Sequence, residues 1–472
     1  DRRRGAVLSR LTRLDAALLF VLGLAVRLPL LLGAVTLHGG DAMARLARSD
    51  HLLLAYQLPL AQSLVFAARA IDPEPRVACV VFVVLGALVP VALAAVVAET
   101  AGRAAGCASG ALLACHALFV HYAIVPYQEG LMIALVLGGA WALLRRHEIA
   151  ASVLLGLACL TRYEAWLAAL LAVLAASGWR WRRLPRALAL FGWAPLLWVA
   201  LWRGLSPAGT YVFDLDPVAL RLTRVWFVLG KLREYSGGLL LALGLLGLAV
   251  AAFRWDKRWG WAAAYLALFL PVIMFGHEFP PGSGRVSERL AHVPAAALCA
   301  LAGLGLGWLV ERAPRAATAA LAAALTVAAA LHGVRHARML ITEAGRDPSL
   351  LLAAQTAAFA HAHLPRGGHL AVAAPTVSPA DLQSFVHKVE AAGGDVGRAR
   401  AVAAELTRHS PDVDRIAAHL ARPPGTVVGA DTAPAELVAV YDDAPDAAAW
   451  QRGLARARFT AGPRAVTVYE RP

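Results

Sequence analysis

The chain has few charged residues and long runs that contain none. Only 16% of its 472 residues are charged, against 59% that are hydrophobic, and the mean hydropathy is +0.60. Soluble globular chains carry about a quarter charged residues, so this composition excludes an ordinary soluble enzyme and a disordered protein. Apolar stretches recur from Leu14 to Val334 and then stop. The pattern predicts a polytopic membrane protein with a soluble tail.

Cysteine, asparagine and lysine are also scarce. The five cysteines all lie in apolar stretches, which excludes a disulfide framework and a cysteine metal site. Asparagine is absent and there are only three lysines, whereas Arg and Ala dominate, as in proteins from GC-rich bacterial genomes. The tail has no repeat, no glycine-rich phosphate loop and no basic-aromatic RNA motif, so we expect no nucleic-acid partner.

The apolar stretches are long enough for a helical membrane domain. They predict an α-helical polytopic membrane protein with about eleven transmembrane helices over residues 1–334, followed by a small α/β domain over 335–472. The stretches between 106 and 178 are short and closely spaced, so one of them could be a half-helix or a re-entrant turn. We expect spans near residues 15–34, 77–98, 106–121, 130–144, 149–163, 165–178, 187–203, 236–253, 260–275, 295–311 and 316–334.

Basic residues gather in alternate loops of the membrane domain. Residues 1–334 hold 30 Lys and Arg against 17 Asp and Glu, whereas residues 335–472 hold 15 against 14. The positive-inside rule then places the N-terminus and the Arg-rich loops in the cytoplasm and, with eleven spans, the tail outside the cytoplasmic membrane. The chain begins with Asp1, so we expect a trimmed start. A signal peptide is the alternative, which Arg27 within the first apolar run disfavours.

The loops expected on the outer side are longer. Residues 35–76 hold Gly39-Gly40-Asp41 and two amphipathic stretches, 42–56 and 59–71, which are typical of helices on a membrane surface. Residues 204–235 form a second loop, and residues 276–294 form a third, whose Pro- and Gly-rich centre predicts mobility.

The tail alternates helix and strand signals, which predicts a small α/β domain. We expect helices at 349–364, 379–392 and 411–421, and strands at 369–374, 426–429, 437–441 and 464–469.

Ionisable side chains converge on the outer ends of the spans. Arg162 and Glu164 stand about 22 Å along a helix from the inner charges, Asp41 follows the first span, and Glu129 opens the fourth. Charges near lipid are costly, so each is a candidate functional residue. Arginines can clamp the phosphate of a lipid-linked sugar, and a carboxylate such as Asp41 can accept the proton of an acceptor hydroxyl. Three further charges precede the tenth span: Arg285, Glu288 and Arg289.

Three motifs, in this order and on this side of the membrane, resemble the GT-C superfamily of polyprenyl-phosphate-sugar-dependent glycosyltransferases. The pattern is similar to the bacterial protein O-mannosyltransferase and aminoarabinose transferase families, and it covers nearly the whole chain. The motifs are Arg27 followed by His38-Gly-Gly-Asp41-Ala-Met-Ala-Arg45, then Val125-Pro-Tyr-Gln-Glu129, then Gly156-Leu-Ala-Cys-Leu-Thr-Arg162-Tyr163-Glu164-Ala-Trp166.

The resemblance implies transfer of a monosaccharide, such as mannose, from a polyprenyl-phosphate donor with inversion at the anomeric carbon. The acceptor would be a protein, lipid or glycan at the outer face of the membrane. Asp41 would be the catalytic carboxylate, and the 276–289 loop would close over the substrates. Arg162, Arg289 and Arg285 would bind the donor phosphate, and the further candidates for substrate binding are Glu129, Glu164, Tyr163 and Arg45.

Two departures from the family pattern concern metal binding. Many relatives have two adjacent acidic residues in the first loop, where this chain has Asp41 followed by Ala42, and residues 121–129 hold no Asp-x-Asp pair. Both favour an enzyme without a cofactor, with a divalent metal as the alternative.

Each candidate also has a structural interpretation. Asp41 could be a turn residue, and Glu129 could stabilise a helix N-terminus. Arg162 with Glu164 could be an interface ion pair, and the remaining arginines could bind headgroups. Arg45 with Arg48 would then form a solvated or headgroup face. The weak metal candidates are His277-Glu278 and Asp214 with Asp216.

Two other functions stay open. A lipid flippase or transporter would need charged or broken helices near the membrane midplane, and Arg27 is the charge found there. A non-catalytic scaffold would use the tail as a binding module.

Overall fold

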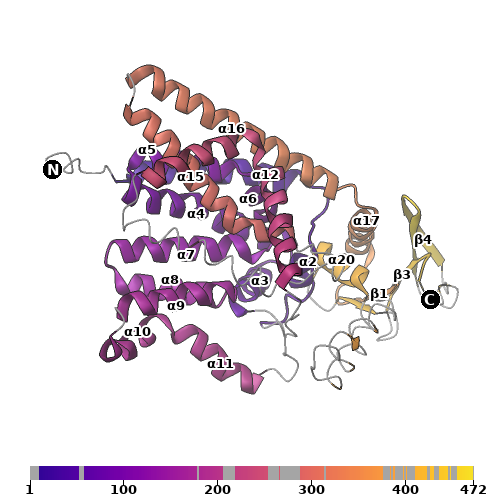
Figure 1. Cartoon of the computed structure of the whole chain (residues 1–472). Coiled ribbons are helices and arrows are strands. Elements are labelled where there is room, and N and C mark those ends of the chain that lie inside the picture. The colour runs from indigo at the N-terminus through magenta and orange to yellow at the C-terminus, as the bar shows by residue number, and fades with distance from the viewer. Residues whose placement is uncertain are drawn as a thin grey trace. The chain divides into compact units, whose positions relative to one another are not determined.

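The chain folds into two compact units in a computed structural model (Figure 1). Unit 1 holds Asp1–Leu30, Phe82–Leu205 and Leu215–Met339, and unit 2 holds Leu31–Val81, Ser206–Asp214 and Leu340–Pro472. The structure describes residues 10–52, 58–177, 180–205, 218–253, 265, 287–312, 315–375, 383, 386–387, 397, 400, 410–422, 426–429, 435–444, 447 and 454–470.

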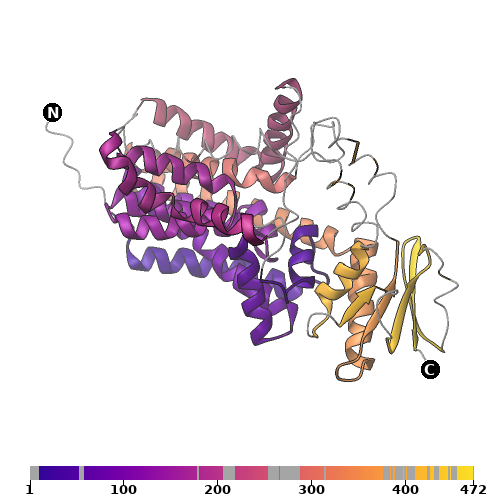
Figure 2. The ribbon, with the colours of Figure 1, turned by 90° about the horizontal axis from the view of Figure 1, so that it is seen from below.

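Unit 1 is built from helices. Helices α7, α8 and α9 lie side by side in Figures 1 and 2, and α12 packs along α15. The elements are α1 (Arg13–Gly33), α4 (Pro75–Ala101), α5 (Arg103–Cys115), α6 (Ala117–Ala123), α7 (Gln128–Leu144), α8 (Glu148–Cys159), α9 (Glu164–Ser177), η1 (Trp181–Arg183), α10 (Leu184–Phe191), α11 (Trp193–Leu205), α12 (Val218–Phe253), η3 (Glu288–Ala291), α15 (His292–Arg312) and α16 (Arg315–Ala344).

Several helices are long and apolar enough to cross a bilayer, as the sequence predicts. Within the described residues there are five, and six if the bent pair α5 and α6 counts as one span. That pair bends by 55° at His116, so it is a broken span or a re-entrant turn, which the sequence left open as a possibility between residues 106 and 178. Helices α7, α8 and α9 are apolar but shorter, and the span expected at 260–275 falls outside the described residues apart from Tyr265. The chain is a multi-pass membrane protein.

The structure corrects the loop expected at 204–235. From Val218 onward this stretch is the first half of α12, which runs for 36 residues and kinks at Gly237. Gly237 has φ of 69°, in the left-handed region that glycine tolerates best. Basic residues interrupt the apolar pattern of the sequence before the kink, so hydropathy alone does not identify this part of the helix. Similarly, α16 continues to Ala344, ten residues beyond the span expected at 316–334.

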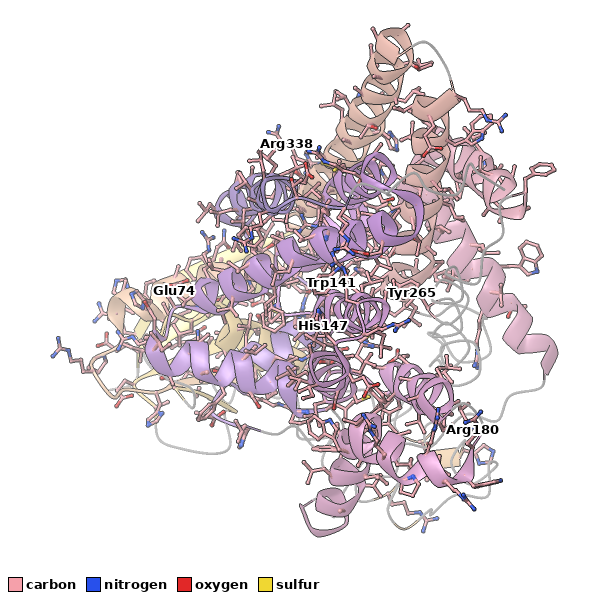
Figure 3. The ribbon with its side chains drawn as sticks, turned by 90° about the vertical axis from the view of Figure 1, so that its left-hand side faces the viewer. Glu74, Trp141, His147, Arg180, Tyr265 and Arg338 are labelled. Atoms are coloured by element: carbon pink, nitrogen blue, oxygen red, sulfur yellow. The ribbon has the colours of Figure 1, made fainter. Side chains whose placement is uncertain are left out.

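One end of unit 1, which we name the basic end, carries the Arg-rich turns that the structure describes. Three ion pairs link elements there: Arg103 to Asp15 at 2.7 Å, Arg145 to Glu99 at 2.6 Å and Arg186 to Glu148 at 2.8 Å. His147 and Arg180, labelled in Figure 3, belong to turns at this end. The fold thus groups the described arginines of these turns.

Unit 2 combines the first loop with the tail. The loop forms α2 (Gly40–Ala47) and α3 (Pro59–Ile71). Helix α3 matches the amphipathic stretch predicted at 59–71, whereas α2 covers only the first part of the stretch predicted at 42–56. The tail forms α17 (Pro348–His363), α20 (Pro411–His419) and a five-stranded sheet. The strands are β1 (Leu370–Ala373), β2 (Val427–Gly429), β3 (Leu437–Tyr441), β4 (Leu454–Ala461) and β5 (Arg464–Glu470).

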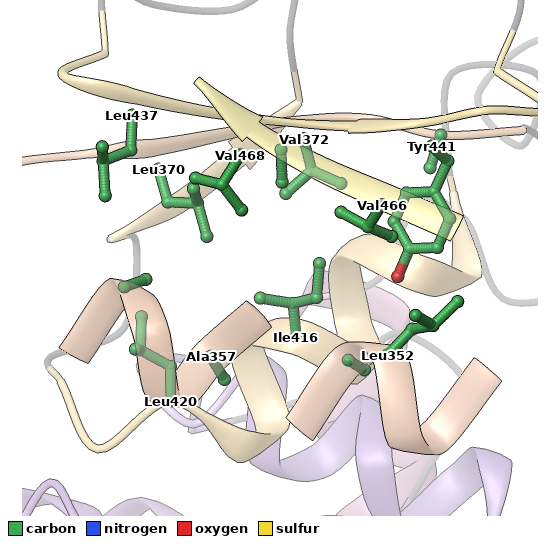
Figure 4. Close-up of a cluster of buried hydrophobic side chains, with 14 of the residues drawn as sticks. Leu352, Ala357, Leu370, Val372, Ile416, Leu420, Leu437, Tyr441, Val466 and Val468 are labelled. Atoms are coloured by element: carbon green, nitrogen blue, oxygen red, sulfur yellow. The ribbon is translucent and has the colours of Figure 1, made fainter. Parts of the chain in front are cut away.

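The sheet has the order β2-β1-β3-β5-β4, parallel over its first three strands and antiparallel over β3, β5 and β4. One face packs on α17 and α20: Figure 4 shows Val372 and Val468 of the sheet facing Ile416 of α20. The tail is therefore the predicted α/β domain. The sequence missed β4, whose side chains are mostly exposed and include Arg456 and Arg458. The helix expected at 379–392 lies largely outside the described residues.

Candidate functional site

The turn between α8 and α9 presents Arg162. Three hydrogen bonds shape this turn: Arg162 N to Ala158 O at 3.1 Å, Thr161 Oγ1 to Leu157 O at 2.9 Å, and Trp166 Nε1 to Cys159 O at 3.0 Å. Together they hold the end of α8 against the start of α9. The backbone at Arg162 is thereby fixed by its neighbours on both sides.

The Arg162 guanidinium lies between two carboxylates. Its Nε is 3.1 and 3.0 Å from the two oxygens of Glu164, its Nη2 also donates to Glu164, and its Nη1 donates to Glu129 Oε1. The side chains are 11% exposed for Arg162, 4% for Glu129 and 13% for Glu164. Charge-assisted, forked pairs of this kind fix the plane of a guanidinium.

A second arginine joins the same carboxylate from a different part of the chain. Arg289, on η3, has its Nε 3.3 Å from Glu129 Oε1 and its Cζ 5.3 Å from the centre of the Tyr127 ring. Glu129 in the first turn of α7 thus bridges two guanidinium groups, while the helix N-terminus favours its negative charge. We name Arg162, Arg289, Glu129 and Glu164 the arginine cluster.

A second cluster, made of acidic, basic and tyrosine side chains, adjoins the arginine cluster. Glu288, next to Arg289, accepts a hydrogen bond from the Tyr122 hydroxyl at 3.0 Å and lies 3.4 Å from Lys231 Nζ. Lys231 also pairs with Glu234 at 2.8 Å. The Tyr122 and Tyr127 rings meet edge to face at 4.9 Å, so aromatic packing connects the two clusters.

The arginine cluster is far from the basic end. Glu129 and Arg145 are at opposite ends of α7, sixteen residues apart, which is about 24 Å along a helix. Formally the cluster is neutral, with two guanidinium groups against two carboxylates. It differs from the basic end in the burial of its arginines, because Arg162 and Arg289 are 11% and 19% exposed, whereas the arginines of the three ion pairs at the basic end are 26% to 77% exposed. Such a site can bind an anion without first ordering its side chains.

The structure brings together four of the residues predicted for the site, Arg162, Arg289, Glu129 and Glu164, all within unit 1. Tyr163 lies beside the cluster but is 41% exposed and packs on Trp166 at 5.2 Å. Asp41 is a half-buried residue in the first turn of α2, in unit 2. Arg285 lies outside the described residues, as do His277-Glu278, Asp214 and Asp216.

The burial of Arg45 contradicts one interpretation drawn from the sequence. Arg45 was expected on a solvated or headgroup face, but its side chain is 0% exposed, and its Nη1 is 3.5 Å from Asp41 O in the preceding turn of α2. Arg48, one turn away, pairs with Asp414 of the tail at 3.6 Å. Local spacing could not reveal these contacts because they depend on packing within unit 2.

Sequence reasoning missed Tyr122, Tyr127 and Lys231 as neighbours of the site. Tyr127 stands within the Val125-Pro-Tyr-Gln-Glu129 motif, which was a usable signal, and Lys231 is one of three lysines in the chain. Lys231 was assigned to a loop, and only the helix α12 shows which face it shares with Glu234.

A metal site is not evident in the part of the chain that the structure describes. Over those residues there is no group of three or more His, Cys, Asp or Glu side chains suited to hold a metal ion.

Comparison with known proteins identifies the fold. No protein-family profile matches the chain, and no curated protein matches it by sequence. Among solved structures, the chain is similar to a crystal structure of ArnT from Cupriavidus metallidurans in the apo state, with a TM-score of 0.52 and 12% identity. The match covers 96% of this chain and 97% of that chain. Over nearly its whole length, the chain therefore has the fold of that ArnT structure.

Proposed function

We propose that the chain is a membrane glycosyltransferase that transfers a sugar from a polyprenyl-phosphate donor to an acceptor at the outer face of the bacterial cytoplasmic membrane. The observation that carries this proposal is the arginine cluster, a buried pair of oriented guanidinium groups at the end of unit 1 opposite the basic end. The ArnT-like fold and the motif resemblance support the same reaction class. Mannose remains the sugar that the resemblance favours.

The cluster suits the phosphate of a lipid-linked donor. A guanidinium that binds a carboxylate through two N–H groups has the geometry that also matches a phosphate. Glu129 and Glu164 orient Arg162, and Tyr127 supports Arg289 from its ring face. In the proposed complex, Arg162 and Arg289 bind the phosphate, Arg285 assists them, and the two glutamates keep both guanidinium groups in place.

Asp41 serves as general base in this proposal. The acceptor hydroxyl oxygen attacks the anomeric carbon of the sugar while the bond from that carbon to the phosphate oxygen breaks. The bonding electron pair leaves with the polyprenyl phosphate, and the hydroxyl proton passes to the Asp41 carboxylate. A single displacement inverts the anomeric configuration. The two arginines stabilise the charge that develops on the leaving phosphate.

The proposed orientation follows the charge distribution. The basic end faces the cytoplasm and the arginine cluster lies at the level of the outer headgroups, where a donor phosphate would be found. The C-terminal domain is then extracytoplasmic. Arg27 is buried, and its Nη1 donates to Gly23 O at 3.0 Å and to Ala114 O at 2.9 Å near the end of α5. These bonds give that membrane-embedded charge a structural role, which weakens the case for a transporter.

The test is release of polyprenyl phosphate from a labelled polyprenyl-phosphate mannose by the purified full-length protein in lipid nanodiscs. We expect release that depends on an acceptor fraction from bacterial envelopes, and a loss of at least about 100-fold for Asp41→Asn. Asp50→Asn is the matched control, because Asp50 lies in the same loop, is half exposed and contacts His51 at 3.8 Å. Its activity should equal that of the wild type.

Other outcomes identify the other functions. Movement of labelled donor across liposomes without its consumption would indicate a flippase. Unchanged transfer by Asp41→Asn would reject Asp41 as the base, and absence of both transfer and transport, together with a wild-type glycan profile in cells that carry Asp41→Asn, would favour a scaffold.

A further inference from the structure

The helices of the first loop pack against the tail within unit 2. Helix α2 lies on α20, and α2 buries Ala42, Met43 and Leu46, each at most 3% exposed. Gln62 of α3 is fully buried and donates to Arg48 O at 2.9 Å and His51 O at 3.0 Å, so α3 holds the end of α2. The short helix that carries Asp41 is thus enclosed by α3 on one side and the tail on the other.

Arg69 of α3 joins the loop to the tail directly. Its side chain is 5% exposed. It donates through Nη2 to Arg422 O at 3.1 Å and Leu420 O at 3.5 Å, and through Nε to Ser49 Oγ at 3.3 Å. One guanidinium therefore connects α3, the second residue after α2 and the chain that leaves α20.

His419, the last residue of α20, holds the chain just before Asp41. Its Nδ1 bonds Arg415 O at 2.7 Å, and its Nε2 accepts the Leu37 N–H at 3.0 Å. These two bonds require the neutral ring with its proton on Nδ1. Three residues, His38, Gly39 and Gly40, separate Leu37 from Asp41, so this bond fixes the start of α2.

We infer that the C-terminal domain acts as a positioning element for the catalytic carboxylate, through Arg69 and His419. The inference rests on the proposed function of Asp41 and adds a role for the tail. Gly39 and Gly40 give the segment before Asp41 little stiffness of its own. Contacts from α20 therefore set where α2 begins and limit the positions that Asp41 can take. Rate falls steeply when a reacting group is displaced by about 1 Å, so loss of these contacts slows transfer.

The test compares Arg69→Gln and His419→Ala with Arg422→Gln in the full-length protein. Arg422 is the matched control, because its guanidinium also caps backbone carbonyls, those of His361, Leu364 and Pro365, but these all lie within the tail. Hydrogen exchange of residues 37–47 and transfer kinetics are measured for each variant. Arg69→Lys serves as the conservative variant, since it keeps the charge but loses the forked donors.

We expect Arg69→Gln and His419→Ala to raise the exchange rate of residues 37–47 and to lower kcat by about 10- to 100-fold. KM for the donor should change less than twofold, because the arginine cluster is unaltered. Arg69→Lys should recover part of kcat, and Arg422→Gln should leave the exchange of residues 37–47 as in the wild type, even if it lowers the melting temperature.

Unchanged exchange at residues 37–47 in both variants would overturn the inference, as would equal losses of kcat in Arg422→Gln. Failure of the proposed function gives a different result. In that case Asp41→Asn itself has no effect on transfer, whatever Arg69→Gln does.

Discussion

The arginines at the two ends of unit 1 differ in their partners and in their exposure. At the basic end, each ion pair joins one arginine to one carboxylate, and Arg186 and Glu148 are 77% and 53% exposed. At the other end, Arg162 and Arg289 share Glu129, which is 4% exposed, and Tyr127 packs on Arg289. Exposed pairs contribute little to stability, whereas a buried shared network fixes geometry. This difference is why we propose that the chemistry takes place at the arginine cluster.

The largest effect should follow from removing the centre of the buried network. We expect Arg162→Gln to lower transfer by about 100- to 1000-fold, because one oriented donor to a developing negative charge is lost. The variant also leaves Glu129 and Glu164 without their shared guanidinium, so the melting temperature should fall. Steady-state kinetics and thermal unfolding in nanodiscs measure the two effects. Activity within twofold of the wild type would remove Arg162 from the site.

A smaller loss is expected from Arg289→Lys. Lysine keeps the positive charge but cannot stack a planar group on Tyr127 while pairing with Glu129. We expect about a tenfold loss of kcat/KM, with most of it in binding of polyprenyl phosphate. Competition with unlabelled polyprenyl phosphate measures that binding. Arg312→Lys at the basic end, where Arg312 lies 5.2 Å from the Trp308 ring, is the control and should bind normally.

A further prediction concerns pH, because His419 of α20 can be protonated. Burial lowers the pKa of His419 from its usual value near 6.5, nearby Arg76 lowers it further, and the bond to Arg415 O opposes the shift. The unfolded chain therefore binds a proton at His419 more readily than the folded chain does. The contribution of neutral His419 to the stability of the fold is present above pH 6.5 and is lost as the pH falls toward the folded pKa.

Hydrogen exchange of residues 37–47 between pH 7.5 and 5.5, corrected for the intrinsic pH dependence of exchange, should show this loss in the wild type. His419→Gln should make the corrected exchange independent of pH over the same range. A wild-type profile that is equally flat would show that His419 does not hold Leu37.

The smallest effect is expected at the basic end. Arg186→Gln removes an exposed pair, so the free energy of unfolding should change by less than about 1 kcal/mol and transfer should stay at the wild-type rate. Thermal unfolding and the polyprenyl phosphate assay check both points. A loss of activity as large as that of Arg162→Gln would erase the distinction between the two ends.

Hydropathy and charge were sufficient to predict the multi-pass fold and the α/β tail, because each leaves a local pattern. They left open a half-helix or re-entrant turn between residues 106 and 178 but did not locate the break at His116. The convergence of Glu129, Arg162, Glu164 and Arg289 was also predicted, since all four fall at the same ends of helices. The burial of Arg45 and the docking of α2 on α20 were not predicted. Contacts between α2 and the tail, such as that of Arg48 with Asp414, join residues more than 360 positions apart. No local periodicity encodes such a contact. Strand β4 was missed because its exposed arginines hide the alternation of a half-buried strand.

The most direct measurement is an experimental structure of the full-length protein in nanodiscs with polyprenyl phosphate bound. We expect phosphate oxygens within hydrogen-bonding distance of both the Arg162 and Arg289 guanidinium groups, with Glu129 still contacting the two arginines. A phosphate bound among Arg180, Arg182 and Arg183 at the basic end, with the arginine cluster unchanged, would contradict the proposed site.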